Sequence, residues 1–399
     1  MGDKGRVGFV PLRYGDGVVG GSEAVSREAA HGLAARGWDV EVLTICARSH
    51  YTWANEYPPG VSRSGPLTVR RFPTVVPRSS RRWETVNRRI RDGDDVSLDE
   101  QLEWVNGLFR VPELFHYLVG HAGAYDALVF SPYLFWPAVA CSAIAPERSV
   151  VIPCLHDEPY ARLDVYRPLL AQSASVWFLS EPEHQLGHRL GGVAPRHAVT
   201  GAGVDIPDGY DAEGFRARHG LRRPFVLFAG RREDGKGWDW LLHAFTRAVE
   251  RGRLPFDLVT IGVGPPMAAD VASERVVDLG FLDDRERDNA FAAAAAYVQP
   301  SRNESFSRTV MEAWLAGTPV VANAASDVVT WHCERSGGGL TYADEVELEE
   351  CLVALADDRA AADALAAAGR DYVVSNYAWS TVLDRMEADL EAVACASSS

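Results

Sequence analysis

Residues 301–323 read SRNESFSRTVMEAWLAGTPVVAN. An apolar run at 296–301 leads into a polar turn, a helical pattern begins at about Ser307, and a second apolar run follows at 319–323. A strand, a turn, a helix and a further buried strand in this order predict a βαβ unit. The segment therefore indicates an α/β protein built on a parallel sheet.

The same alternation extends along the chain in both directions. A first series of strands ends near residues 204–207, and a second series begins at Arg222. Two such series predict two Rossmann-like halves, with ligands at the carboxyl ends of the strands. The expected strands cover residues 6–12, 39–45, 127–133, 149–155, 175–180, 197–204, 224–230, 257–264, 276–282, 296–301 and 319–323. The expected helices cover residues 20–37, 238–251, 284–296, 345–370 and about 380–394, besides the one from about 307.

The composition excludes several classes of protein. The chain has 399 residues, of which 47% are hydrophobic, and this is enough for two or three cores. No run of about 18 uncharged apolar residues is present, and the first residues lack a signal-peptide core, so we expect a cytoplasmic protein. Six scattered cysteines without a CxxC pair indicate reduced thiols. A net charge of −15 argues against nucleic acid as a partner.

Residues 50–120 fit the alternation poorly. Between residues 61 and 91, nine arginines accompany a single acid, Glu84. The first interpretation is a long solvated insertion. The alternative is a surface patch that recognises an anionic acceptor or a membrane, with peripheral membrane contact through Arg63–Arg91.

Residues 301–323 contain two acids whose spacing argues against acid–base catalysis on one bond. Glu304 and Glu312 are eight residues apart, which on one helix is about 12 Å. Glycosidase carboxyl groups lie about 5–9.5 Å apart. The pair is better suited to holding two ends of an extended ligand. Between them, Ser305, Phe306 and Ser307 are expected to offer backbone N–H groups at a helix N-terminus, where anions bind. The alternative makes Glu304 a cap partner and Glu312 a solvated helix residue.

A second segment, FAGRREDGKGWDWLL at 228–242, places Arg231 and Lys236 on either side of a turn at the end of a strand. The chain has only one other lysine, Lys4. A compact ammonium group held in such a turn suits a phosphate, because Lys and Arg are not interchangeable there. Two cations at this place can stabilise a leaving diphosphate, whereas the alternative is a surface turn with two solvated cations.

Two further segments follow strands in the first half. Gly20 and Gly21 lie in a turn before a helix, where backbone can approach a ligand closely, although the dinucleotide fingerprint is absent. Glu23 is either a first-turn acid facing the helix dipole or an acceptor contact. His156, Asp157 and Glu158 crowd the end of an apolar strand, which indicates either a site or a structural histidine. Their spacing does not indicate a metal site.

Together these segments resemble glycosyltransferase family 4 of the GT-B fold. The most specific element is the E-x7-E pair, Glu304 and Glu312, combined with the turn that holds Arg231, Lys236 and Gly237. GGSE near the N-terminus, LVTIGVGP, VVDLGFL and the C-terminal YAWSTVL agree, so the resemblance covers nearly the whole chain. It implies two Rossmann-like domains facing a central cleft, with a C-terminal helix that crosses back to the N-terminal domain. We therefore expect domains at 1–206 with 375–399 and at 207–374.

The resemblance also implies roles for these residues in binding a nucleotide-diphosphate sugar. Arg231 and Lys236 would neutralise the diphosphate, Glu304 would bind sugar hydroxyls and Glu312 the ribose. The remaining implied donor contacts are backbone at Ser305, Phe306 and Ser307, the residues Gly262 and Phe281, Gly20 and Gly21 on the phosphates, and His156 beside the reacting sugar. The family often has glycine where Ser307 stands. Glu23, Asp157 and Glu158 remain candidates for the acceptor.

The expected function is that of a retaining glycosyltransferase that moves a hexosyl group to a hydroxyl acceptor. No enzymic nucleophile is needed, because the leaving diphosphate helps to deprotonate the acceptor, and charge stabilisation is then the main catalytic requirement. We expect no cofactor and no metal. UDP is the expected carrier, with GDP as the alternative, and the acceptor is a natural product, a polysaccharide or a lipid-linked sugar. The rival interpretations are a GT-B sugar-nucleotide epimerase, an inverting transferase and a non-catalytic nucleotide-sugar-binding subunit.

Overall fold

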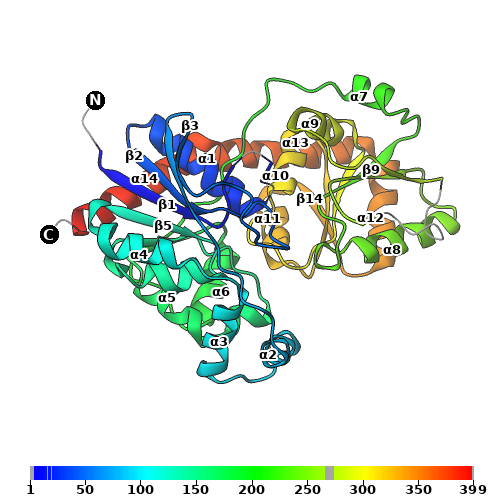
Figure 1. Cartoon of the computed structure of the whole chain (residues 1–399). Helices are drawn as coiled ribbons and strands as arrows, with labels where there is room; N and C mark the ends of the chain where they lie inside the picture. Colours follow the sequence, from blue (N-terminus) through cyan, green and yellow to red (C-terminus); the bar gives the residue numbers. More distant parts are fainter. Residues whose placement is uncertain (1–3, 16, 19, 266–273, 398–399) are drawn as a thin grey trace. The chain divides into compact units, whose positions relative to one another are not determined.

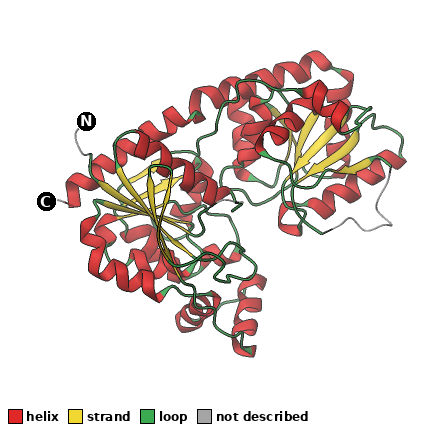
Figure 2. Ribbon diagram, turned by 45° about the horizontal axis from the view of Figure 1, so that its top comes forward, coloured by secondary structure: helices red, strands yellow, loops and turns green. Residues whose placement is uncertain are grey.

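The computed structural model describes residues 4–15, 17–18, 20–265 and 274–397. The chain divides into two compact units. Unit 1 comprises Met1–Gly203 and Trp379–Ser399, and unit 2 comprises Val204–Ala378. Each unit is built around a sheet with helices packed on it (Figures 1 and 2).

The sheet of unit 1 has the strand order β3-β4-β2-β1-β5-β6-β7-β8. All neighbouring strands are parallel except β3 and β4 at one edge, which are antiparallel. The strands are β1 (Arg6–Pro11), β2 (Asp39–Ile45), β3 (Gly60–Ser64), β4 (Leu67–Phe72), β5 (Ala127–Ser131), β6 (Ser149–Val151), β7 (Ser175–Phe178) and β8 (His197–Val199). Its α-helices are α1 (Gly21–Ala35), α2 (Arg81–Asp92), α3 (Leu98–Leu108), α4 (Pro112–His121), α5 (Arg167–Gln172), α6 (Glu181–Arg189) and α14 (Trp379–Ser397). Short helical turns lie at η1 (Ala122–Ala124), η2 (Pro137–Cys141), η3 (Pro146–Arg148), η4 (Pro159–Arg162) and η5 (Asp164–Tyr166).

The sheet of unit 2 is parallel throughout, in the order β11-β10-β9-β12-β13-β14. The strands are β9 (Phe225–Ala229), β10 (Asp257–Ile261), β11 (Val276–Asp278), β12 (Ala296–Gln299), β13 (Val320–Asn323) and β14 (Gly339–Tyr342). The helices are α7 (Ala212–Arg218), η6 (Asp234–Lys236), α8 (Trp238–Glu250), α9 (Asp284–Ala293), α10 (Arg308–Leu315), α11 (Asp327–Ser336), α12 (Glu345–Asp357) and α13 (Arg359–Tyr377).

Both sheets follow the doubly wound order, which confirms the prediction of two Rossmann-like sheets. In unit 2 the order reverses between β9 and β12, and in unit 1 between β1 and β5. Ligands of such sheets bind outside the carboxyl ends of the strands at this switch point. The strands read as continuous apolar runs because helices cover both faces, and every residue of β9 and β12 is buried (Figure 2).

The interpretation of residues 50–120 as a solvated insertion is wrong. β3 and β4 extend the sheet of unit 1, and α2, α3 and α4 bury Val86, Trp104 and Leu114 in its core. The apolar residues of these elements face the core, and the arginines lie on the opposite, solvent-facing side, where they form ion pairs. Arg82 and Arg89 of α2, for example, pair with Glu103 and Glu100 of α3. The many arginines therefore make the apolar pattern hard to recognise in the sequence.

The predicted helix at 345–370 is two helices. Asp358 separates α12 from α13, and its side chain accepts a hydrogen bond from the Ala361 backbone N–H. Aspartate at an N-cap satisfies one of the unpaired N–H groups of the new helix. The chain therefore begins α13 at this point.

The C-terminal helix packs on unit 1, as the GT-B expectation requires. Leu383 of α14 contacts Gly32 of α1, where a Cβ atom would lie 2.5 Å from the leucine methyl. Trp38 Nε1 donates to Glu387 Oε1 at 2.8 Å. Among the described residues, no helix has the length and apolar character that crossing a bilayer requires.

Candidate active site

The switch point of unit 2 brings an acid and a cation from separate segments into contact. Lys236 follows β9 in the turn η6, and Glu304 follows β12. Lys236 Nζ lies 2.7 Å from Glu304 Oε1, and their side chains are 30% and 12% exposed. The two strongest sequence signals therefore meet where a doubly wound sheet binds its ligand.

Glycine is required next to this ion pair. Gly237 has a φ of 70° and is the N-cap residue of α8. A Cβ atom at this position would lie 2.6 Å from the Pro300 carbonyl oxygen. The loops after β9 and β12 thus touch through their backbones, and a side chain at residue 237 would separate them.

Gln299 connects the members of this site, and the sequence analysis missed it. Its Nε2 donates to Glu304 Oε1 and to Ser307 Oγ, both at 3.0 Å, while its Oε1 accepts from the Ser301 N–H at 2.6 Å. The side chain is buried at 4% exposure. A buried polar side chain needs its hydrogen bonds, so Gln299 fixes the turn that carries Glu304. The available signal was a glutamine ending an apolar strand.

The segment 305–307 enters α10 in a strained conformation. Ser307 is the N-cap residue and has a φ of 65°, in the left-handed region. Phe306 is buried against His332 and Tyr377, with ring centroids 5.3 Å and 4.9 Å away. Its side chain anchors the segment, so the backbone of 305–307 is the part suited to ligand contact.

Arg231 and Glu312 form their ion pairs with other residues. Arg231 Nη2 lies 3.0 Å from Glu233 Oε1, and Glu312 Oε2, on α10, lies 3.7 Å from Arg287 Nε on α9. Of the four predicted charged residues, Lys236 and Glu304 are in direct contact.

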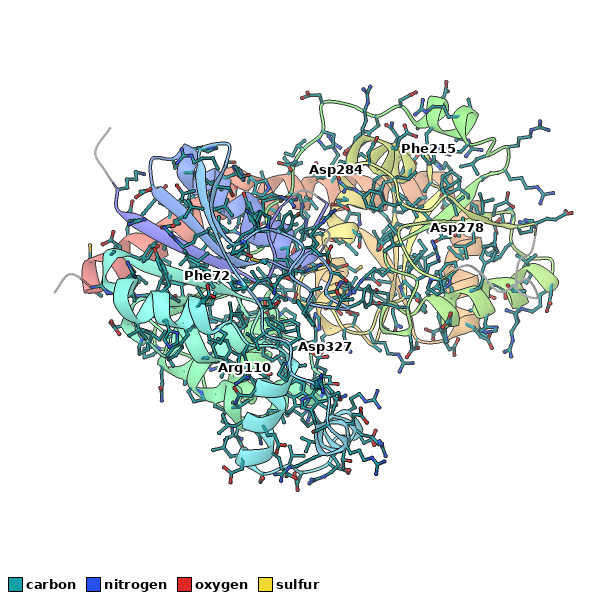
Figure 3. The ribbon with its side chains drawn as sticks, in the orientation of Figure 1. Phe72, Arg110, Phe215, Asp278, Asp284 and Asp327 are labelled. Carbon is teal, nitrogen blue, oxygen red and sulfur yellow. The ribbon has the colours of Figure 1, made fainter. Side chains whose placement is uncertain are left out.

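The loops after β9, β10 and β11 are tied together by a second arginine that the sequence analysis passed over. Arg232, 5% exposed, donates to Asp278 Oδ1 at 2.8 Å and to the carbonyl of Gly262 at 3.3 Å. Asp278 is labelled in Figure 3. Gly262 has a φ of 121°, and a Cβ atom there would lie 2.1 Å from the Gly230 carbonyl oxygen. Phe281, beyond β11, is 63% exposed.

In unit 1 the glycine-rich turn before α1 encloses a buried ion pair. Residues 16 and 19 lie outside the described residues. Arg13 Nη2 lies 2.6 Å from Glu23 Oε1, and both side chains are buried. A Cβ atom at Gly20 would lie 2.2 Å from Glu23 Oε2, whereas Gly21 has open space around it. Gly20 is therefore needed for packing against Glu23, and Gly21 leaves its backbone accessible.

His156, Asp157 and Glu158 follow β6. His156 Nδ1 lies 3.8 Å from Glu158 Oε1, which also accepts from the Tyr133 hydroxyl at 3.0 Å, and Asp157 pairs with Arg162 at 2.5 Å. These contacts bring His156 and Glu158 together.

The buried carboxylate of Glu183, on α6, fixes the backbone just before His156. Its Oε1 accepts from the Leu155 N–H at 2.6 Å and its Oε2 from the Leu179 N–H at 2.5 Å. The carboxyl group thereby joins the ends of β6 and β7. Burial raises the pKa of Glu183 to about 8, against the opposing effect of these N–H donors.

Unit 1 also contains a basic pocket of about 340 Å³ at one end of its sheet. Arg71 Nη2 donates to the Tyr14 carbonyl at 3.1 Å, and its guanidinium lies 4.6 Å from the Tyr57 ring centre. No acid is found among the described lining residues, which are Tyr14, Gly15, Arg48, Tyr57, Ser62, Arg63, Ser64, Val69 and Arg71. Such a pocket favours an anion.

The second half of the chain matches a family model. Residues 223–368 match the model described as "Glycosyl transferases group 1". A D-inositol 3-phosphate glycosyltransferase from Catenulispora acidiphila is 27% identical over 93% of this chain and 90% of its own length. Residues 223–368 therefore form a glycosyl transferase group 1 region.

Solved structures agree with this family at the level of the fold. Sucrose-phosphate synthase from Thermosynechococcus elongatus superposes with a TM-score of 0.72 at 18% identity, over 96% of this chain and 98% of that chain. HepE from Anabaena, in complex with UDP-glucose, gives 0.69 at 19% identity, over 97% and 100%. The fold of this chain is GT-B.

Proposed function

We propose that this chain is a group 1 glycosyltransferase that moves a hexosyl group from a nucleotide-diphosphate sugar to a hydroxyl acceptor, with retention and without a metal. The observation that carries the proposal is the contact between Lys236 and Glu304 at the switch point of unit 2. It joins a phosphate-binding cation, a carboxylate suited to sugar hydroxyls and the entrance of α10.

In this proposal Lys236 and Arg231 neutralise the diphosphate as it leaves. Without donor, Lys236 is neutralised by Glu304, so the incoming diphosphate competes with that carboxylate for the ammonium group. Glu304 is then available to accept hydrogen bonds from sugar hydroxyls. Backbone N–H groups of 305–307 complete the anion site, and Glu312 binds the ribose.

The donor is proposed to be a UDP sugar. HepE, which shares the fold, binds UDP-glucose. The loops that Arg232 holds place Gly262 and the exposed ring of Phe281 beyond β10 and β11, where a base can stack. For unit 1, we propose Gly20, Gly21 and His156 as further donor contacts, on the family resemblance.

The acceptor is proposed to carry a phosphate or another anionic group. The basic pocket of unit 1 presents Arg48, Arg63 and Arg71 without an acid among its described lining residues. A relative that spans nearly the whole chain acts on D-inositol 3-phosphate. Arginine binds such groups through two parallel hydrogen bonds, which gives geometric selectivity.

Replacement of Lys236 tests the transfer reaction. We expect Lys236→Ala to lower the turnover of UDP-glucose by more than tenfold, because the leaving diphosphate loses a charged hydrogen bond. Lys4→Ala is the control, since Lys4 is the chain's other lysine and pairs with Glu387 in unit 1. Assays run in EDTA, with thermal melting of each variant as a check on folding.

Wild-type turnover in a folded Lys236→Ala variant would remove this residue from the mechanism. Inversion at the anomeric carbon would contradict the retaining step, and loss of transfer in EDTA would contradict metal independence. Isomerised sugar formed from donor alone would favour the epimerase. Donor binding without transfer to any acceptor would favour a binding subunit.

The acceptor proposal has its own test. We expect inositol phosphate to be a better acceptor than inositol, and Arg71→Gln to raise the KM for the phosphorylated acceptor by at least tenfold with the donor KM unchanged. Arg82→Gln, an exposed arginine of α2 outside the pocket, is the matched control. Equal use of both acceptors by all three proteins would rule out the anion pocket.

A further inference from the structure

Unit 1 contains a cluster of three histidines, two on α6 and one on β8. His184 and His188 are four residues apart on α6, and His197 begins the edge strand β8. Each offers one ring nitrogen, and these three atoms lie within 4.8 Å of one another. His184 Nε2 and His188 Nε2 are 3.0 Å apart.

The hydrogen bonds of two rings turn their Nε2 lone pairs toward the cluster. His197 Nδ1 lies 3.0 Å from the Ala194 carbonyl oxygen, and His184 Nδ1 lies 3.3 Å from Glu181 Oε1. A carbonyl or carboxylate oxygen only accepts, so each Nδ1 carries the proton in the neutral ring and Nε2 is left without one. Metal-binding histidines are commonly held in this way by a carboxylate or a backbone carbonyl.

The geometry points to a binding site for a divalent transition-metal ion: we propose that His184, His188 and His197 coordinate Zn²⁺ or a related late first-row ion through three imidazole nitrogens. Tetrahedral Zn²⁺ with bonds of about 2.0–2.1 Å separates its ligand atoms by about 3.4 Å. One pair of nitrogens lies 3.0 Å apart and all three lie within 4.8 Å, so these distances bracket 3.4 Å. Small rotations of the rings, of which His188 and His197 are exposed, therefore bring the three nitrogens to the metal-binding distance.

The sequence does not predict this site because its ligands meet only in the fold. His184 and His188 share a helix face at i and i+4, but the third ligand comes from a strand. The metal would be structural: it would tie α6, which carries Glu183, to β8, a three-residue strand that pairs only with β7 among the described strands. The site is separate from the catalytic role proposed for unit 2.

Metal uptake by untagged protein tests the proposal. After treatment with chelator and desalting, Co²⁺ is titrated and followed by its visible absorption, then displaced with Zn²⁺. We expect one Co²⁺ per chain with the intense bands of tetrahedral nitrogen coordination, and a rise in Tm on adding Zn²⁺. His188→Ala and His197→Gln should each weaken binding by at least tenfold, because each removes a ligand.

His243→Ala, an exposed histidine of α8 in unit 2, is the matched control and should bind like the wild type. Circular dichroism shows whether each variant is folded. The proposal is overturned if wild type takes up no Co²⁺, or if folded His188→Ala and His197→Gln bind it as tightly as His243→Ala. Because uptake and melting are measured without donor or acceptor, the result is independent of glycosyl transfer.

Discussion

The backbone before α10 is strained at a single residue, Ser307. Its φ of 65° lies in the left-handed region, which costs an L-residue about 1 kcal/mol or more. The serine compensates in part, since its Oγ accepts a hydrogen bond from buried Gln299. This chain thus has serine at position 307, where the backbone conformation favours glycine. The family that the sequence resembles often has glycine at this position.

Two substitutions at Ser307 separate strain from hydrogen bonding. Both Ser307→Gly and Ser307→Ala lose the bond to Gln299, but only glycine relieves the backbone. We therefore expect the glycine variant to be more stable than the alanine variant by about 1 kcal/mol in urea unfolding. Equal stability of the two variants would show that this conformation is not strained in solution.

At the same scale, the charged residues of the candidate site can be predicted from sequence more readily than the buried polar residues that hold them in place. Lys236 and Glu304 could be identified because each lies in a polar turn between an apolar strand and a helix, and because Lys236 is one of two lysines in the chain. The structure joins them. Gln299 and Arg232 could not, because a buried polar side chain differs from a surface one only through its partners in the fold. The histidine cluster was missed because its three rings come from a helix and a strand that meet only in the fold.

At the scale of elements, α11 packs against the segment 305–307 through a buried histidine, His332. His332 is fully buried, contacts the Phe306 ring and lies 2.9 Å from the Tyr372 hydroxyl through Nδ1. Burial, together with the charge of Arg335, lowers the pKa of His332 from 6.5 to about 3. Protonation is therefore resisted while α11 remains folded.

This histidine predicts acid sensitivity of unit 2. Because the folded pKa lies below the unfolded one, the stability is full above about pH 6.5 and falls by about 1.4 kcal/mol per pH unit as the pH drops from there toward 3. We expect wild type to lose about 1 kcal/mol more than His332→Gln between pH 7 and pH 5.5 in urea unfolding. His243→Gln, which replaces an exposed histidine, should behave as wild type. Parallel curves for all three proteins would contradict the prediction.

The elements themselves divide into predictable and unpredictable ones. Strands buried on both faces could be placed from sequence, since β9 is apolar throughout and β12 is apolar up to its last residue, Gln299. β3 is exposed along most of its length, so it lacks the alternation of a half-buried strand. α2 buries only a narrow stripe, Val86 and Ile90, and its many arginines favoured the interpretation as a solvated insertion. Tertiary packing, rather than local propensity, decides such segments.

At the scale of the whole molecule, the chain returns to unit 1 after completing unit 2. α13 belongs to unit 2 and α14 to unit 1, and the change falls between Ala378 and Trp379. A Cβ atom at Gly203 would lie 2.2 Å from the ring of Trp379, so the first residue of α14 packs tightly against the end of the first segment of unit 1. Unit 1 is therefore complete only when the last helix has been added.

One hydrogen bond inside unit 1 tests this dependence. The indole N–H of fully buried Trp177, on β7, donates to Asp389 Oδ2 of α14 at 2.7 Å. Asp389→Ala leaves that N–H unpaired, at a cost of about 1–3 kcal/mol, whereas Asp389→Asn keeps an acceptor and should lose less. Asp384 is also on α14, and its 72% exposed carboxylate pairs with Arg36, the C-cap residue of α1. Asp384→Ala should therefore cost less than about 1 kcal/mol. Urea unfolding gives the ranking, and hydrogen exchange at β7 shows whether the loss is local. If Asp384→Ala and Asp389→Ala cost the same, α14 acts as a surface cover, and the core of unit 1 is stable without it.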